Sequence, residues 1–141
     1  MTEPKVTWDG QTVFVSNRTG AVTLSNEGRA AVLEIAGVFD IALAPQVRAL
    51  AGRAVGAAPD VLVVDLTLVE FLSSAGMGEL VRIHRALGRD KVRVVVADEI
   101  VRRPLELTRL TGVLALYPTL PAALDGVAAP GRDPVPAARP R

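Results

Sequence analysis

Residues 61–78, with the sequence VLVVDLTLVEFLSSAGMG, decide the fold of this chain. The stretch begins with a run from Val61 to Leu66 in which every residue except Asp65 is apolar. An apolar run that does not alternate with polar residues is typical of a parallel strand that is covered on both faces. We therefore predict that residues 61–66 form the central strand of a largely parallel sheet.

The next predicted element is a helix over residues 75–87. Apolar side chains recur there at helical spacing, and the predicted buried stripe consists of Met77, Leu80, Val81, His84 and Leu87, flanked by Ile83. The residues expected to face solvent are Glu79, Arg82, Arg85 and Arg89. A buried strand followed by an amphipathic helix is typical of an α/β fold.

Elements on both sides of this unit continue the alternation. Upstream, we predict a hairpin of two short strands at 21–24 and 30–35, followed by a helix at 44–54. Downstream, the predicted order is a strand at 91–97, a helix at 104–110, an edge strand at 114–117 and a helix at 120–124. The pattern predicts an α/β domain with a mixed, mostly parallel sheet of four to five strands and about four helices.

The two ends of the chain depart from this pattern. Residues 1–20 form an N-terminal extension, in which the sequence around Val13 is either an extra strand or an arm that orders on contact. Residues 126–141 contain four prolines among alanines and arginines, so we expect a flexible tail. The domain is therefore placed at residues 21–125.

The first residues also bear on localisation. They are polar and acidic, where a secretory signal would be basic and then apolar. No apolar run approaches the roughly 18 residues that a membrane helix needs. We expect a cytoplasmic protein that does not bind membranes.

The composition of the 141 residues excludes several classes of function. With no Cys and one His, the chain offers no thiolate nucleophile and no ordinary zinc site, so we expect neither a metal nor a cofactor. A net charge of +1 gives no general attraction to nucleic acid. Aromatic residues make up only 4% of the chain, which disfavours the stacking surfaces that bind single strands. A partner must therefore recognise a local surface.

Candidate chemistry is concentrated where the central strand ends and the second helix begins. Ser73 and Ser74 lie there beside the small residues Ala75, Gly76 and Gly78. The carboxyl ends of strands in open α/β sheets are common places for sites, and a helix N-terminus favours an anionic group. The alternative is that Ser73 caps the helix and that the small residues allow close packing of helix and strand.

Enzymatic motifs do not fit this segment. A nucleophile elbow would need Gly at Leu72, and the only histidine, His84, lies on the same predicted helix, where a structural role is expected. Gly78 is followed by Glu instead of the Lys of a phosphate-binding loop, and a dinucleotide fingerprint would need Gly at Val81. We therefore expect a binding protein and not an enzyme.

Two carboxylates, Asp40 and Asp65, follow or lie within predicted strands. Asp40 and Asp65 are expected at one edge of the sheet, which gives weak support to paired-carboxylate catalysis without a second polar cluster to bind a substrate. Asp40 also directly precedes a helix, where Asp is a common cap or turn residue. Either role, structural or functional, stays open for Asp40.

Three separated segments of the sequence resemble a STAS domain of the anti-sigma factor antagonist type. They are Ala36-Gly-Val-Phe-Asp40 with Ala44-Pro-Gln-Val-Arg-Ala-Leu50, Val61-Leu-Val-Val-Asp-Leu66 with Phe71-Leu-Ser-Ser-Ala-Gly-Met-Gly78, and Val92-Arg-Val-Val-Val-Ala97 with Arg103-Pro-Leu-Glu-Leu-Thr-Arg-Leu-Thr-Gly112. The similarity covers about residues 21–125 and agrees in order and spacing. It implies a single STAS-type domain.

The serine motif of that family reads Asp-Ser-Ser/Thr-Gly-Leu-Gly, and its first serine is phosphorylated by a cognate anti-sigma kinase. The resemblance places this serine at Ser74. Ser73 stands where the family has Asp and is the second candidate acceptor, while Ala75 replaces the following Ser/Thr. Gly76-Met77-Gly78 corresponds to Gly-Leu-Gly.

The resemblance also implies a partner switch. The unmodified antagonist binds an anti-sigma factor with a serine-kinase fold and frees sigma, phosphorylation ends that binding, and a serine phosphatase restores it. The expected partner-binding residues are Phe39, Asp40, Leu72, Ser73, Ser74, Ala75, Gly76 and Met77. Two alternatives stay open: an unmodified STAS subunit of a larger assembly, such as a stress-sensing complex or a transporter accessory, and a binder of a small molecule or nucleotide.

Overall fold

The structure is a computed structural model and describes residues 11–127. Its centre is a six-stranded sheet, with the strands in the same order in space as along the chain. The strands are β1 (Val13–Ser16), β2 (Gly20–Glu27), β3 (Ala30–Phe39), β4 (Val61–Leu72), β5 (Val92–Val95) and β6 (Leu116–Tyr117). The helices are α1 (Ala44–Gly56), α2 (Ser74–Leu87), α3 (Glu99–Leu107) and α4 (Leu120–Leu124), with short 3-10 turns at Arg89–Lys91 and Leu110–Gly112.

The pairing of the strands confirms a mixed α/β sheet. β1, β2 and β3 pair in antiparallel fashion, whereas the β3–β4, β4–β5 and β5–β6 pairs are parallel. The sheet has six strands where four to five were expected, and the additional strand is β1, which is the extra strand offered as one alternative for the N-terminal extension. Val13 and Val15 pack against the main core from this strand, while Phe14 is exposed.

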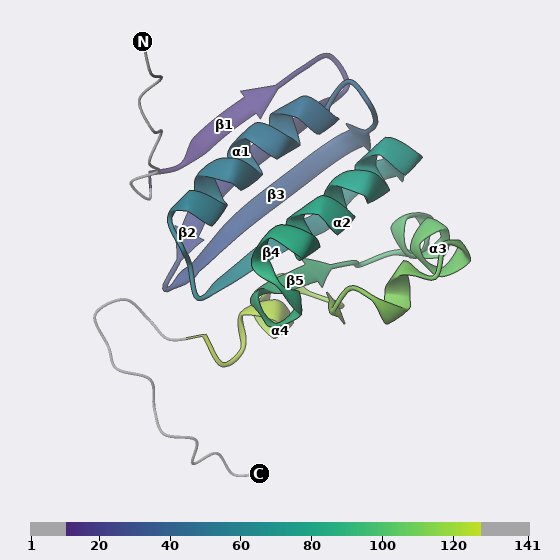
Figure 1. Ribbon diagram of the computed structural model, residues 1–141. Coiled ribbons are helices and arrows are strands. Elements are labelled where there is room, and N and C mark those ends of the chain that lie inside the picture. The colour runs from purple at the N-terminus through teal and green to yellow at the C-terminus, as the bar shows by residue number, and fades with distance from the viewer. Residues whose placement is uncertain (1–10, 128–141) are drawn as a thin grey trace.

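Helices cover both faces of the sheet. α1 and α2 lie side by side on one face (Figure 1), where they pack over buried residues such as Leu33, Leu62 and Val64. On the opposite face, Val63 and its neighbours pack against Ala123 of α4. The start of β4 is therefore covered on both sides, which confirms the reading of its continuous apolar run. No helix within residues 11–127 is long and apolar enough to cross a membrane.

β4 is twice as long as the sequence predicts, because it continues past Leu66 to Leu72. Its pairing with β3 shifts register twice, and each shift places an additional residue in β4. Such β-bulges kink a strand and interrupt the simple alternation of its side chains. After both shifts, Phe39 at the end of β3 lies opposite Leu72 at the end of β4. The segments that follow the two strands therefore start next to each other.

α3 begins earlier than predicted. It spans Glu99–Leu107 and contains Pro104, so Arg102 and Arg103 lie in a helix and not in a loop. The side chain of Asp98 caps it by accepting hydrogen bonds from the backbone N–H groups of Ile100 and Val101. This cap starts the helix upstream of the proline, where the sequence pattern alone favours a break.

The buried face of α2 is also rotated from the predicted stripe. Its buried residues are Gly76, Glu79, Leu80 and Ile83, whereas Met77, Val81, His84 and Leu87 are half-buried. The expectation that Glu79 faces solvent is therefore wrong. The predicted flexible tail falls almost entirely on residues 128–141, which lie outside the described residues.

Candidate functional site

The loop after β3 and the start of α2 are joined through Phe39. The backbone N–H of Ser73 donates to the carbonyl of Phe39 over 3.0 Å, and the Ser73 hydroxyl donates to the same carbonyl over 2.9 Å. Two hydrogen bonds on one acceptor fix the first turn of α2 against the end of the neighbouring strand. Asp40 and Ser74, which follow these residues, are thereby held at one edge of the sheet.

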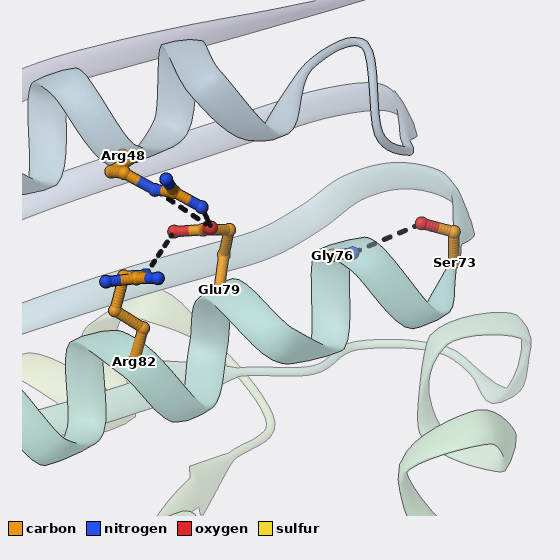
Figure 2. A network of polar contacts seen from close by, with 5 residues as sticks. All are labelled: Arg48, Ser73, Gly76, Glu79 and Arg82. Carbon is orange, nitrogen blue, oxygen red and sulfur yellow. Dashed lines mark hydrogen bonds and ion pairs between the residues drawn. The ribbon is translucent and has the colours of Figure 1, made fainter.

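Ser73 is the N-cap of α2. Its backbone is extended, with φ −86° and ψ 174°, and its Oγ accepts a hydrogen bond of 3.1 Å from the N–H of Gly76 (Figure 2). The hydroxyl thus donates to Phe39 and accepts from Gly76 at the same time. This geometry bears out the capping alternative for Ser73.

Gly76 is required by the packing beneath this turn. A Cβ at this position would lie 2.8 Å from both the Phe39 carbonyl oxygen and Leu72 Cδ1, and 2.9 Å from Phe39 Cγ. Contacts this short do not occur between real Cβ atoms and backbone oxygens, so a larger side chain would push α2 away from β3. The small residue therefore keeps the helix start close to the strand ends.

Ser74 is the first residue of α2 and is exposed. The first backbone N–H groups of a helix have no partner within the helix, and the helix dipole is positive at this end. His84, the only histidine, lies ten residues further along α2, which corresponds to about 15 Å of helix. It is therefore too distant to activate the Ser74 hydroxyl, and the enzyme-like arrangement of serine and histidine is not formed.

Asp40 organises the turn that leads into α1. Its Oδ1 accepts hydrogen bonds of 3.1 Å from the N–H groups of Ala42 and Leu43, and the side chain is half-buried. The N-cap residue of α1 is Leu43, whose side chain has no hydrogen-bond acceptor. Asp40, three residues upstream, supplies the carboxylate that accepts from the N–H groups before the helix. The structural role of Asp40 is established by these bonds, and its position beside Ser73 leaves it on the same edge.

Asp65 is not part of this edge. It lies seven residues before Leu72 on β4, which corresponds to about 23 Å of extended strand. It is buried, and its Oδ1 accepts hydrogen bonds from the N–H and hydroxyl of Thr67. The expectation that Asp40 and Asp65 meet is therefore wrong, because the bulged extension of β4 separates them. Paired-carboxylate catalysis has no geometric basis here.

The remaining predicted site residues divide into buried and accessible ones. Phe39 and Leu72 are buried, so their side chains support the site from below and do not form its surface. Ala75 and Met77 are half-buried, next to the exposed Ser74. Phe71, just before Leu72, is 54% exposed. Within residues 11–127, no group of three or more His, Cys, Asp or Glu side chains could hold a metal ion.

One protein-family model matches the part of the chain that forms this domain. The model of the family described as "STAS domain" matches residues 21–123, which is most of the chain. The chain belongs to the STAS domain family. Strands β3 to β6, the paired helices α1 and α2, and the serine-containing start of α2 fall within the matched region, whereas β1 precedes it.

Two related proteins are similar to this STAS domain at 30% identity or more. The anti-sigma-F factor antagonist RsfB of Mycobacterium tuberculosis is 36% identical over 107 residues, which cover 75% of this chain and 88% of RsfB. The crystal structure of an anti-sigma factor antagonist from Mycobacterium paratuberculosis superposes with a TM-score of 0.70 at 30% identity, covering 86% of this chain and 98% of that one.

A third protein supports the fold alone. The anti-sigma factor antagonist SpoIIAA, solved in its unphosphorylated form, superposes with a TM-score of 0.62 at 22% identity, covering 74% of this chain and 93% of that one. The likeness confirms that the STAS fold predicted from the sequence is the fold of this chain.

One polar cluster of this STAS domain is missed by sequence reasoning. Glu79 of α2 is buried, and its Oε2 accepts hydrogen bonds from Nε and Nη2 of Arg48 on α1 (Figure 2). Its Oε1 lies 3.6 Å from Nε of Arg82, one turn further along α2. The hydrogen bonds from Arg48 and the attraction between the two charges raise the pKa of the Arg48 guanidinium above its ordinary value. The ion pair joins the two helices that cover one face of the sheet.

A weak signal for this cluster does exist in the sequence. Glu79 stands three residues after Gly76 and four before Ile83, which is the spacing of a helix face that packs on a sheet. A carboxylate at such a position needs a cationic partner when it is buried. That partner, Arg48, is 31 residues away in sequence, and only the packing of α1 against α2 identifies it.

Proposed function

We propose that this STAS domain is an anti-sigma factor antagonist whose binding is switched off by phosphorylation of Ser74. The observation that carries the proposal is the different structural environment of two adjacent serines. Ser73 uses its hydroxyl as donor and acceptor within the fold, whereas Ser74 is exposed at the first position of α2. A kinase can reach the hydroxyl of Ser74 without opening the helix cap. The similarity to RsfB agrees with this class of function.

The physical consequence of modification favours a switch of binding over a switch of folding. A phosphate at Ser74 adds about −1.5 to −2 charges next to a helix N-terminus, which stabilises an anion by roughly 0.3–1 kcal/mol. The folded state therefore tolerates the phosphate. A partner that covers Ser74 would have to bury that charge, which commonly costs about 2–5 kcal/mol of binding free energy when no cation pairs with it.

The proposed partners follow from this chemistry. The unmodified protein binds an anti-sigma factor that also has a serine-kinase fold, which releases the sigma factor for transcription. A serine phosphatase removes the phosphate and restores binding. The surface proposed for the anti-sigma factor comprises the accessible residues Asp40, Ser73, Ser74, Ala75 and Met77, supported by the buried Phe39, Leu72 and Gly76. On this proposal the domain acts in the cytoplasm, as a binding module without catalytic activity of its own.

The proposal is tested by phosphate transfer and by binding. Each kinase-fold anti-sigma factor encoded in the source genome is purified and incubated with ATP and this protein, and the intact mass of the protein is measured. We expect one factor to add a single phosphate to the wild type and to Ser73→Ala, and none to Ser74→Ala. Phosphate that persists in Ser74→Ala but disappears in Ser73→Ala would place the acceptor one residue earlier.

Binding of the same factor to three proteins completes the test. By calorimetric titration, Ser74→Ala should bind as the wild type does, and Ser74→Glu should bind at least about tenfold more weakly. Melting curves should show that all three proteins are folded. Equal affinity of all three proteins would contradict the switch and favour an unmodified STAS subunit of a larger assembly.

A further inference from the structure

A groove of about 750 Å³ runs between α1 and α2 and reaches the start of α2, because Ala75 is one of its lining residues. Its charged lining residues are three arginines and one glutamate, a formal charge of +2: Arg48, Glu79, Arg82 and Arg85. The whole chain has a net charge of only +1. The groove is therefore a local positive surface on a nearly neutral protein.

Glu79 holds two of these cations in place. It accepts hydrogen bonds from Arg48 and lies 3.6 Å from Nε of Arg82, while the side chains of the two arginines are 56% and 58% exposed. A guanidinium has five N–H donors, so pairing with one buried carboxylate uses only part of the set. The third cation, Arg85, is exposed and forms no salt bridge within residues 11–127. Because Glu79 already fixes Arg48 and Arg82, these two side chains lose less conformational entropy when they bind further carboxylates.

Gly78 lines the groove without contributing a side chain to it. A Cβ at this position would meet no atom within 4 Å, so the fold itself does not require glycine there. Glycine inside a helix is less favourable than alanine. A chain bound in the groove would be able to approach α2 more closely here than over a longer side chain.

We infer that this arginine-lined groove binds an acidic segment of the anti-sigma factor, a stretch rich in Asp and Glu. The inference rests on the proposed function and gives the phosphate switch an additional cause. A phosphate on Ser74 would stand at the end of the groove and repel the acidic segment that occupies it. A neutral or basic segment would lack charge complementarity with the three arginines.

The first test uses a fluorescein-labelled peptide of ten glutamates, with a ten-glutamine peptide as its neutral counterpart. Arg85→Glu is the principal variant, because Arg85 supports no ion pair in the described part of the fold. Arg29→Glu is the matched control. Arg29 lies in the turn before β3, about 30 Å from Phe39 along the strand, and its 4.0 Å contact with Asp60 is exposed.

We expect saturable binding of the glutamate peptide to the wild type and to Arg29→Glu, with an affinity at least about tenfold lower for Arg85→Glu. The difference should shrink at high salt, since exposed charges are then screened. Melting curves should show all variants folded. Equal binding to the wild type and Arg85→Glu, or equal binding of the glutamate and glutamine peptides, would overturn the inference.

The second test repeats the titration with the anti-sigma factor and separates the two proposals. If Arg85→Glu binds the factor as tightly as the wild type while Ser74→Glu does not, the groove is not the docking surface, but the switch at Ser74 stands. If Ser74→Glu binds as the wild type does while Arg85→Glu binds at least about tenfold more weakly, the groove is supported and the switch is not.

Discussion

The hydroxyl of Ser73 donates a hydrogen bond of 2.9 Å to the carbonyl oxygen of Phe39, 34 residues earlier in the chain. This bond joins the cap of α2 to the end of β3, and it leaves the neighbouring Ser74 as the serine with an exposed side chain. Two adjacent residues of the same type therefore have separate tasks. Ser73 fixes the start of α2 to β3, and Ser74 is exposed at the surface that we propose for partner binding.

The two serines should differ in their effects on stability. Ser73→Ala removes both the cap acceptor for Gly76 and the donor to Phe39, so the free energy of unfolding should fall by about 1 kcal/mol, within the range of roughly 0.5–2 for a lost cap. Ser74→Ala should change it by less than about 0.5 kcal/mol. Urea denaturation followed by circular dichroism measures both values. A larger loss for Ser74→Ala than for Ser73→Ala would contradict the assigned roles.

The two glycines of the serine motif should respond in opposite directions to alanine. Gly76→Ala places a methyl group 2.8 Å from the Phe39 carbonyl oxygen and should destabilise the protein by about 1–3 kcal/mol. Gly78→Ala meets open space and should stabilise α2 by about 0.5–1 kcal/mol. Thermal denaturation of the two variants is the direct comparison. If both are destabilised equally, the packing beneath α2 is not as described.

Gly78→Ala should nevertheless weaken binding of the anti-sigma factor while it stabilises the isolated fold. The added methyl group lies in the groove between α1 and α2, where the partner backbone is proposed to approach. Calorimetric titration beside the melting curve separates the two effects. An affinity equal to that of the wild type would mean that no close contact forms at this position.

Removing Arg48 should cost more stability than removing both members of its ion pair with Glu79. Arg48→Ala leaves the buried carboxylate of Glu79 without its two hydrogen bonds from Arg48, so the free energy of unfolding should fall. Glu79→Leu fills the same buried position with an apolar side chain, and the double variant should recover most of the loss. A double-mutant cycle by urea denaturation measures the coupling, and strictly additive effects would contradict it.

Asp40→Asn should preserve the turn and change binding. The amide oxygen of Asn can accept the same two hydrogen bonds from Ala42 and Leu43, so stability should change by less than about 0.5 kcal/mol. Affinity for the anti-sigma factor should change, because the negative charge beside Ser73 is lost. Asp40→Ala is the control that removes the turn as well, and it should lower stability by about 1 kcal/mol. Unchanged affinity of Asp40→Asn would leave Asp40 with a structural role alone.

Local sequence patterns account for most of the fold and for part of the site. The apolar run of Val61–Leu66 predicts a central strand because a strand that is covered on both faces consists almost entirely of apolar residues. The continuation of β4 to Leu72 has no such sequence pattern, because two register shifts against β3 interrupt the alternation of inward and outward side chains. Where a strand ends is then decided by its neighbour. The separation of Asp40 from Asp65 follows from that unpredicted length.

Other differences between expectation and structure also come from distant partners or from caps. Pro104 predicts a helix start, but the cap at Asp98 begins α3 upstream and the helix accommodates the proline. Glu79 reads as a solvent-facing charge until α1 places Arg48 against it. At the site, the spacing of residues identifies the helix start with its two serines, while only the bond to Phe39 shows which of them is the cap.

The order of the strands has a consequence for the synthesis of this protein. Each of the six strands lies beside its predecessor in the chain, so no strand has to insert between two others that are already paired. As the chain leaves the ribosome, the β1–β2–β3 meander can form first, and each later strand can add to an edge that already exists. The segment that carries Ser73 and Ser74 follows β4, so the proposed switch is assembled on a sheet whose first four strands have all been made.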